Sequence, residues 1–492
     1  IYQTASAYLD RLQYKYEDET SKLHIAERSH NLHEGAIAVS YDLYRATGDN
    51  KYKEQAFHFA EKSRYRLLAE LTRDTHAKEY ANIPDSLMEY EHNLKGRLTK
   101  YNHYIAQYNQ PRAVTDSSKL SAYRDSIFTI NRRLQQHFND LEERYPKYYQ
   151  FKYDRHLLDI GTLQQKWLRD NQAILEYFLG SDNLYSFSLT SSSFEINKVA
   201  VEDSLNAQIQ EYRKSIRDKE SGHWISAGYQ LYETLVRPNT EVLDKEKIII
   251  IPDGELHYLP FETLLTQPVE TPESQSPDYS SMPYFIKDHA ISYDLSTHFH
   301  VKHKNESETS SPNRENSLLA IAPSFNDSLT AGKASQADTS YRLDLTSLPL
   351  ARYEARSIAE LARDQDNIWN WFTPARVEVW TGEKATERRI KNSDLSNYNH
   401  IHLATHAYVS EKNPEQTAIY LTQESDTLNT TNDGILSTAE LYNMDLNASL
   451  VVLSACQTGY GPFINGEGIM GLTRPIFYSG ASNVMVSLWQ VS

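Results

Sequence analysis

The chain contains one cysteine, Cys456, and it stands directly behind an apolar run. Residues 450–455 read Leu-Val-Val-Leu-Ser-Ala, and Gln-Thr-Gly, a turn-forming sequence, follows the cysteine. Fifty residues earlier, His406 follows a similar run at 401–404. If the two runs are neighbouring parallel strands, both side chains lie at the carboxyl ends, where α/β sheets bind ligands. A histidine that takes the proton of a cysteine generates a thiolate nucleophile, because the imidazolium stabilises the charged sulfur.

A structural role for the cysteine is the alternative. Free cysteine is among the most buried residue types, and at the end of an apolar strand it is often a small core residue. Two features favour the nucleophile: Cys456 is the only cysteine among 492 residues, and His406 occupies the equivalent place behind its own run. A lone cysteine cannot form an internal disulfide, so no oxidising compartment is required and the cytoplasm is the expected location.

Two further patterns near these residues have alternative interpretations. His400 and His402 share one face of a predicted strand and would suit zinc, but no carboxylate or thiol motif nearby completes a ligand set. Gly466-Glu467-Gly468 resembles an anion-binding helix N-terminus, but it lacks the lysine and the strand context of a P-loop. We therefore expect no metal and no cofactor. We expect these glycines to shape the loop beside the cysteine, with Glu467 favouring the dipole of a helix that starts there.

The second half of the chain alternates short β-rich runs with helical ones. Strands are predicted at 174–178, 185–190, 247–252, 317–322, 401–404, 418–422, 450–454 and 483–488, and helices at 204–216, 227–235, 351–361, 386–390 and 468–479. Such alternation predicts an α/β domain with a mostly parallel sheet flanked by helices. Polar stretches at 266–283, 302–316 and 326–340 are predicted surface loops.

The first half is predicted to be all-helical. Apolar residues recur with helical spacing before and after the break at Gly48: Ala36, Val39, Leu43 and Ala46 on one helix face, then Tyr52, Ala56, Phe59 and Ala60. This helix–turn–helix pattern resembles the later half of a tetratricopeptide unit. Two charge-rich helical stretches at 86–108 and 117–145 predict an antiparallel helical hairpin. Because about three repeats are needed for a continuous core, we expect the chain to start inside a longer repeat array.

A series of short motifs follows the order found in one known family. They include, in chain order, Ile-Ile-Pro-Asp-Gly at 250–254, Leu-His-Tyr-Leu-Pro-Phe-Glu at 256–262, Leu-Pro at 348–349, Thr-His-Ala at 405–407, Asp-Gly-Ile-Leu at 433–436, Ser-Ala-Cys-Gln-Thr-Gly at 454–459, Gly-Leu-Thr-Arg at 471–474, Gly-Ala at 480–481 and Ser-Leu-Trp at 487–489. Over about residues 157–492 the chain resembles the CHAT domain, a caspase-like peptidase domain often found behind tetratricopeptide repeats.

This resemblance implies a role for each motif residue. It makes His406 the general base, Cys456 the nucleophile, and the backbone N–H groups of Cys456 and Ala407 the oxyanion hole. Caspases have glycine after the histidine, but Ala407 supplies the same N–H group if its φ is negative. Caspases also place the histidine about 50 residues before the cysteine. The strand near 484–489 corresponds to the one that lines the first specificity pocket, which makes Trp489 and Gln490 the pocket residues.

Charge and hydropathy limit the partners. Fifty basic and 66 acidic residues give a net charge of −16, which argues against nucleic acid or an anionic membrane as the main partner. Apolar runs such as 248–251 and 448–455 are far shorter than the roughly 20 residues of a membrane helix. We expect a protein substrate and a regulatory protein that docks on the helical repeats.

The sequence therefore predicts three successive parts: a TPR-like remnant at 1–84, a helical hairpin linker at 85–156 and a caspase-like peptidase domain at 157–492. The predicted function is a cysteine endopeptidase with a Cys456–His406 dyad whose activity the helical repeats control. The alternative is a non-catalytic scaffold whose caspase-like domain only binds proteins. Because the last predicted strand has no covering helix behind it, we also expect the domain to be truncated at its C-terminal end, which would leave an inactive fragment as a third possibility.

Overall fold

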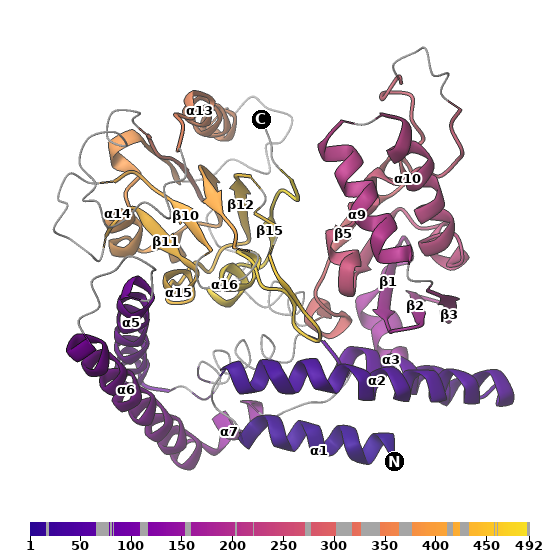
Figure 1. Ribbon diagram of the computed structural model, residues 1–492, viewed down its shortest axis with the longest axis horizontal. Helices are drawn as coiled ribbons and strands as arrows, with labels where there is room; N and C mark the ends of the chain where they lie inside the picture. Colours follow the sequence, from indigo (N-terminus) through magenta and orange to yellow (C-terminus); the bar gives the residue numbers. More distant parts are fainter. Residues whose placement is uncertain are drawn as a thin grey trace. The chain divides into compact units, whose positions relative to one another are not determined.

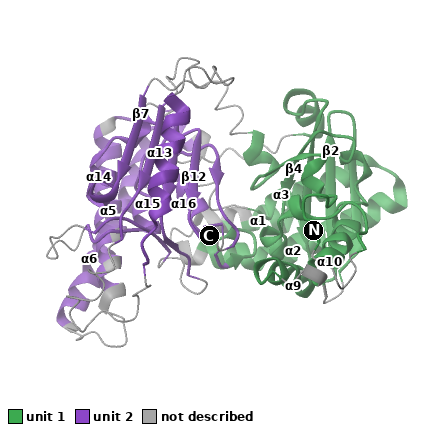
Figure 2. Ribbon diagram, turned by 90° about the horizontal axis from the view of Figure 1, so that it is seen from above, with its two compact units in different colours: residues 1–69, 155–310, 463–469 green, residues 70–154, 311–462, 470–492 purple. Residues whose placement is uncertain are grey.

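The computed structural model forms two compact units, coloured separately in Figure 2. It describes residues 1–15, 19–64, 78, 81, 83–108, 117–152, 159–201, 204–219, 221–270, 277–301, 317–325, 345–363, 376–410, 417–423, 432–456, 458–459 and 461–489. Unit 1 consists of 1–69, 155–310 and 463–469, and unit 2 of 70–154, 311–462 and 470–492. Each unit thus gathers separate stretches of chain. The division into three successive parts stays a prediction.

Unit 1 begins with the predicted helix–turn–helix. Helices α1 (Tyr2–Lys15), α2 (Glu19–Thr47) and α3 (Asn50–Lys62) follow one another. Gly48 has a φ of 69°, a left-handed conformation that glycine adopts without steric cost, and Asp49 Oδ1 accepts a hydrogen bond from Lys51 N at 3.0 Å. The helices and their break are confirmed, whereas the tetratricopeptide character stays a prediction.

The apolar face of α2 that the sequence indicates is buried only in part. Ala36 is buried as expected, but Val39 and Leu43 are 44% and 39% exposed, and Ala46 is exposed as well. The buried stripe of α2 continues instead through Ile37, which packs with α3 and with the first sheet. Helix α2 therefore presents a different stripe to its neighbours, because a sheet as well as a helix lies against it.

The sheet of unit 1 has five strands in the order β3-β2-β1-β4-β5. Their bounds are β1 Gln172–Leu179, β2 Asn183–Thr190, β3 Phe194–Ala200, β4 Lys247–Ile251 and β5 Ala290–Tyr293. Strands β1, β2 and β3 pair antiparallel, and β4 and β5 run parallel to β1. The expectation of one largely parallel sheet is wrong for this part, because the connections at 180–182 and 191–193 are too short for a parallel crossover.

Helices cover both faces of this sheet (Figure 1). Leu175 and Tyr177 face the core under α9 (Ser204–Arg217) and α10 (Ser221–Leu235), whereas Ile174 and Phe178 face the core that α2 and α3 share. Alternate residues of β1 thus enter different cores, as the two-residue period of a strand requires.

Unit 2 contains the parallel sheet that the sequence predicts. Its strands are β6 Ser317–Ala322, β7 Arg376–Thr381, β8 His400–Ala404, β12 Leu450–Ser454 and β15 Val484–Met485, in the order β15-β12-β8-β6-β7. Every pairing among them is parallel. A small antiparallel sheet of β9 (Ala407–Tyr408), β10 (Ala418–Tyr420) and β11 (Ile435–Ser437) follows β8.

Helices of unit 2 pack on both faces of the parallel sheet. Helix α13 (Pro349–Arg363) places Ala351 and Ala355 against Ala320 and Ala404. The opposite face packs with α14 (Glu387–Asn392), α15 (Thr438–Leu441) and α16 (Thr473–Tyr478). The small alanine side chains let α13 approach the sheet closely.

The region after the cysteine differs from the prediction. The predicted helix at 468–479 begins only at Thr473, and β13 (Phe463–Ile464) and β14 (Gly468–Ile469) form a hairpin before it. Gly466 and Gly468 have φ angles of +83° and +74°, which a right-handed helix cannot contain. Glu467 therefore lies in a hairpin and not at a helix start, so the expected dipole interaction is wrong.

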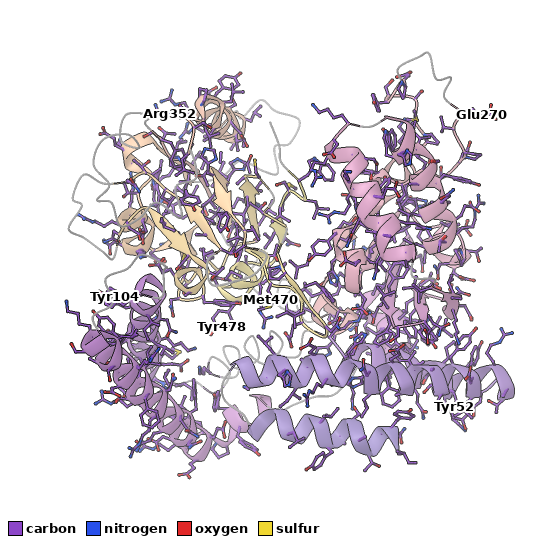
Figure 3. All side chains as sticks on the ribbon, in the orientation of Figure 1. Tyr52, Tyr104, Glu270, Arg352, Met470 and Tyr478 are labelled. Carbon is purple, nitrogen blue, oxygen red and sulfur yellow. The ribbon has the colours of Figure 1, made fainter. Side chains whose placement is uncertain are left out.

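Helices α5 (Asp85–Tyr108) and α6 (Ser117–Arg144) of unit 2 pair antiparallel, as predicted (Figure 1). The rings of Tyr104, which Figure 3 labels, and Tyr123 are 5.2 Å apart near one end, and those of Tyr90 and His137 are 5.4 Å apart near the other. Helix α7 (Pro146–Lys152) follows.

The remaining short elements connect the larger ones. They are α8 Ile160–Thr162, η1 Leu163–Trp167, η2 Thr240–Val242, η3 Gly254–Tyr258, η4 Phe261–Thr263, η5 Phe285–Lys287, η7 Gly382–Lys384 and η8 Leu395–Asn397. Gly254, in the turn after β4, has a φ of 57°, a left-handed conformation. None of the helices in the described stretches combines the length and apolar character needed to cross a bilayer.

A buried carboxylate joins the helical hairpin to the chain before it. Glu91 contacts Lys78 at 2.8 Å, Lys95 at 2.7 Å and His137 at 3.5 Å. Burial alone would raise the pKa of Glu91, but these three groups outweigh burial and hold the pKa well below its usual range. We expect Glu91→Gln to lower the opening free energy of α5 by about 3 kcal/mol, because buried cations lose their partner. Hydrogen exchange of α5 amides measures this, and Glu89→Gln, at an exposed position of the same helix, should change nothing.

A buried histidine makes unit 1 sensitive to acid. His33 is fully buried, donates from Nδ1 to Ser29 O at 2.8 Å, and burial lowers its pKa to about 4. Between pH 6.5 and 4 the unfolded chain therefore binds a proton that the folded chain does not, so stability falls as the pH falls, by about 3 kcal/mol over that range. Hydrogen exchange of α2 across these pH values should show this loss. His33→Gln should flatten the dependence, and His24→Gln, at an exposed position of α2, should leave it unchanged.

Candidate active site

Strands β8 and β12 lie side by side and run parallel. Their register pairs His400 with Leu450 and Ala404 with Ser454, and Thr405 N donates to Ser454 O at 3.2 Å just beyond the strands. His406 and Cys456 each follow two residues after the Ala404–Ser454 pair. Both predicted residues therefore lie at the same edge of the sheet, at equivalent positions after neighbouring strands that are about 4.8 Å apart.

The His406 ring is held from two sides. Its Nε2 lies 2.8 Å from the carbonyl oxygen of Thr346, and its ring centroid lies 4.9 Å from that of Phe325 at an angle of 57°. A carbonyl oxygen only accepts hydrogen bonds, so Nε2 carries the hydrogen. In the neutral ring the lone pair is therefore on Nδ1, which makes Nδ1 the atom that can take a proton.

Cys456 is half-buried in the turn that follows β12. The segment after β15 holds this turn: Gly459 N donates to Ser487 O at 2.8 Å, and Ser487 N donates to Thr458 Oγ1 at 3.0 Å. Ser487 Oγ also donates to Ala455 O at 2.5 Å. The residue directly before the cysteine and the two described residues that follow Gln457 are thus tied to one neighbouring segment.

Of the two predicted pocket residues, the structure describes one. Trp489, two residues after Ser487, is half-buried. Gln490 lies outside the described residues. The bonds to Thr458 and Gly459 place Ser487 beside the turn that carries the cysteine. The role of Trp489 and Gln490 in a pocket stays a prediction.

Ala407 opens the small antiparallel sheet. Tyr420 N donates to His406 O at 2.9 Å, and the next pair in the ladder is Ala407 with Ile419. Hydrogen-bonded and non-hydrogen-bonded pairs alternate in an antiparallel ladder, so the N–H of Ala407 points away from β10. The Ala407 N–H group therefore lies on the side of β9 that faces away from β10.

The histidines that raised the zinc alternative have other partners. His402 Nε2 lies 2.8 Å from Glu354 Oε1 on α13, and burial lowers the pKa of His400. Among the residues that the structure describes, no group of three or more histidine, cysteine or carboxylate side chains is arranged to hold a metal ion.

Thr346 and Phe325 were missed by sequence reasoning. They lie 60 and 81 residues before His406 in the chain, and the contribution of Thr346 is a backbone carbonyl, which no residue type encodes. The one sequence signal near Thr346 was the Leu-Pro motif at 348–349, which begins two residues later in the chain.

The hydroxyl of Thr458 tests how the cysteine turn is held. Thr458 is fully buried, and its Oγ1 accepts the hydrogen bond from Ser487 N. Thr458→Val keeps the shape but removes the acceptor, which should reduce the protection of the Ser487 amide by about tenfold, since an unmade buried hydrogen bond costs about 1–2 kcal/mol. Hydrogen exchange gives the value. Thr458→Ser retains the acceptor, and equal losses in both variants would contradict this role.

Comparison with known families identifies the family of the chain. A family model described as CHAT domain matches residues 226–492, more than half of the chain. The comparison with curated proteins returned no match. The matched region includes β8, β12, the histidine and cysteine that follow them, and the hairpin at 463–469. The chain therefore belongs to the CHAT family, a family of the caspase-like clan.

Proposed function

We propose that the chain is a cysteine endopeptidase that cleaves a protein partner through a Cys456–His406 dyad. The register of β8 and β12 is the observation that carries this proposal, because it brings the sole cysteine and a histidine to the same edge of the sheet in phase. Membership of a caspase-like family supports the same chemistry.

The proposed reaction uses atoms of the chain alone. His406 Nδ1 takes the proton of the Cys456 thiol, and the thiolate attacks the scissile carbonyl carbon to form a tetrahedral oxyanion. Backbone N–H groups of Cys456 and Ala407 stabilise the negative oxygen. The imidazolium then gives its proton to the leaving amine as the C–N bond breaks. Water, deprotonated by the same nitrogen, hydrolyses the thioester and restores the thiol.

Two contacts prepare the histidine for this cycle. The hydrogen bond from Nε2 to Thr346 O fixes the tautomer that leaves Nδ1 basic, and it strengthens when the ring becomes positive because charged donors bond more strongly. The Phe325 ring limits rotation of the imidazole. Because the imidazole is already oriented before the reaction, little entropy is lost in positioning it for the transition state.

Specificity and control are assigned to other parts of the chain. Trp489 and Gln490 are proposed to line the first specificity pocket, and the net charge of −16 favours basic or neutral substrates. The N-terminal helices are proposed to bind a regulatory protein and to control the peptidase. The proposed location is the cytoplasm, and the reaction needs no cofactor.

Alkylation of the single thiol tests the dyad. Iodoacetamide labelling followed by intact mass across pH 5–9 reports Cys456 alone, because the chain has no other cysteine. We expect a midpoint well below the ordinary thiol pKa of about 8.5. His406→Ala should return the midpoint to about 8.5. The matched control is His402→Ala, a change within β8 and four residues before His406, which should leave the midpoint low.

Two results would contradict the proposal. One is a midpoint near the ordinary value in the wild-type chain, unchanged by His406→Ala. The other is labelling that occurs only after denaturation. Either result favours the non-catalytic scaffold. Once a protein partner is identified, Cys456→Ala separates the two functions directly. An enzyme with this change no longer cleaves the partner but still binds it. A scaffold cleaves nothing before the change, and its binding is unaltered after it.

A further inference from the structure

The hairpin that follows the cysteine belongs to a different compact unit from the cysteine itself. Cys456 lies in unit 2, and residues 463–469 lie in unit 1 (Figure 2). Only residues 457–462 separate them. Phe463 pairs with Ile469 in the hairpin, and Met470, which Figure 3 labels, closes its base by donating from N to Pro462 O at 2.8 Å.

The first strand of the hairpin packs on an aromatic partner in unit 1. The Phe463 ring centroid lies 5.4 Å from that of His257, in η3, at an angle of 42°. His257 Nδ1 donates to Gly254 O at 3.0 Å, and burial lowers its pKa to about 4, so the ring is neutral near pH 7. Two uncharged rings therefore meet at the base of the hairpin.

The tip of the hairpin packs against the N-terminal helices. A Cβ atom added to Gly466 would lie 3.0 Å from Ser63 O, at the end of α3, and 3.2 Å from Ala26 O, in α2. Hairpin turns normally face solvent, yet Gly466 and Glu467 are buried. A φ of +83° and backbone oxygens at this distance leave room for glycine alone.

The surface that receives the tip is itself fixed. Arg64, directly after Ser63, donates from Nη1 to Pro252 O at 2.9 Å, and its Nε lies 3.5 Å from buried Glu176. Glu61 accepts hydrogen bonds from Thr297 N at 3.0 Å and His298 N at 2.8 Å. The end of α3 is thus joined to the strands and turns around it, so a shift of α3 would move the whole contact surface.

We propose that the hairpin at 463–469 is a positioning element for Cys456, which transmits the state of helices α2 and α3 to the nucleophile. This inference rests on the proposed function and names the route by which the N-terminal helices control it. Only six residues join Cys456 to Phe463, so a change in how the hairpin packs on α2 and α3 acts on the chain close to the thiol. A misplacement of about 1 Å is enough to cost about 10²-fold in rate.

Gly466→Ala strains the docking, because the added Cβ crowds two backbone oxygens, and a matched control exists. Gly48 also has a positive φ, 69°, but a Cβ there meets nothing within 4 Å. Gly48→Ala therefore imposes the same kind of backbone strain without the clash. A second test, without backbone strain, is Phe463→Ala compared with Phe463→Tyr, which retains the ring on His257. Far-UV circular dichroism checks that each variant is folded.

Iodoacetamide labelling of Cys456 is read at two pH values. At pH 9 the thiol is ionised with or without His406, so the rate reports exposure of the cysteine loop alone. We expect Gly466→Ala and Phe463→Ala to raise this rate at least about threefold and to lower the ratio of the pH 6 rate to the pH 9 rate by about tenfold, as the thiol pKa moves toward 8.5. Gly48→Ala and Phe463→Tyr should label like the wild-type chain.

Equal labelling of all variants and the wild-type chain at both pH values would overturn the inference. If Gly466→Ala does not fold, the Phe463 pair decides alone. The two proposals fail separately. Slow wild-type labelling at pH 6 refutes the activated dyad, whereas the comparison at pH 9 still shows whether the hairpin controls the cysteine loop.

Discussion

The register between β8 and β12 is the constraint on which the candidate site depends. Backbone hydrogen bonds fix it, and the side chains enforce it, because Ile401 and Leu403 enter the same core as Val451 and Leu453. A slip of one residue would turn one of these apolar sets toward the other face of the sheet. The same phase that buries them delivers the histidine and the cysteine together. Core packing and site geometry are therefore consequences of one pairing.

Backbone groups orient the residues of the candidate site. The carbonyl of Thr346 determines which nitrogen of His406 carries hydrogen, and the ladder between β9 and β10 determines where the N–H of Ala407 points. The turn after the cysteine is held through Thr458 and Ser487. The first two of these features involve main-chain atoms, so they depend on the path of the backbone more than on residue type.

The chain passes from one compact unit into the other and back within a few residues of the nucleophile. The proposed route runs through a hairpin that packs on α2 and α3, which lie more than 390 residues earlier in sequence. Both units have their own sheet and their own core.

The sequence by itself determined much of this protein. Alternating and helical hydrophobic periods located β1, β2, β4, β6, β8 and β12 and most long helices, since these patterns are local. The motifs at 405–407 and 454–459 identified the histidine and cysteine and the CHAT family. Tertiary structure decided the rest. The chain forms two large sheets where one was expected, and α2 buries a different stripe from the apolar one that the sequence indicates. The β13–β14 hairpin stands where a helix was predicted to start. The Thr346 carbonyl accepts a hydrogen bond from His406. These features depend on contacts between residues far apart in the chain and on backbone atoms, which all residues share, so no local pattern records them.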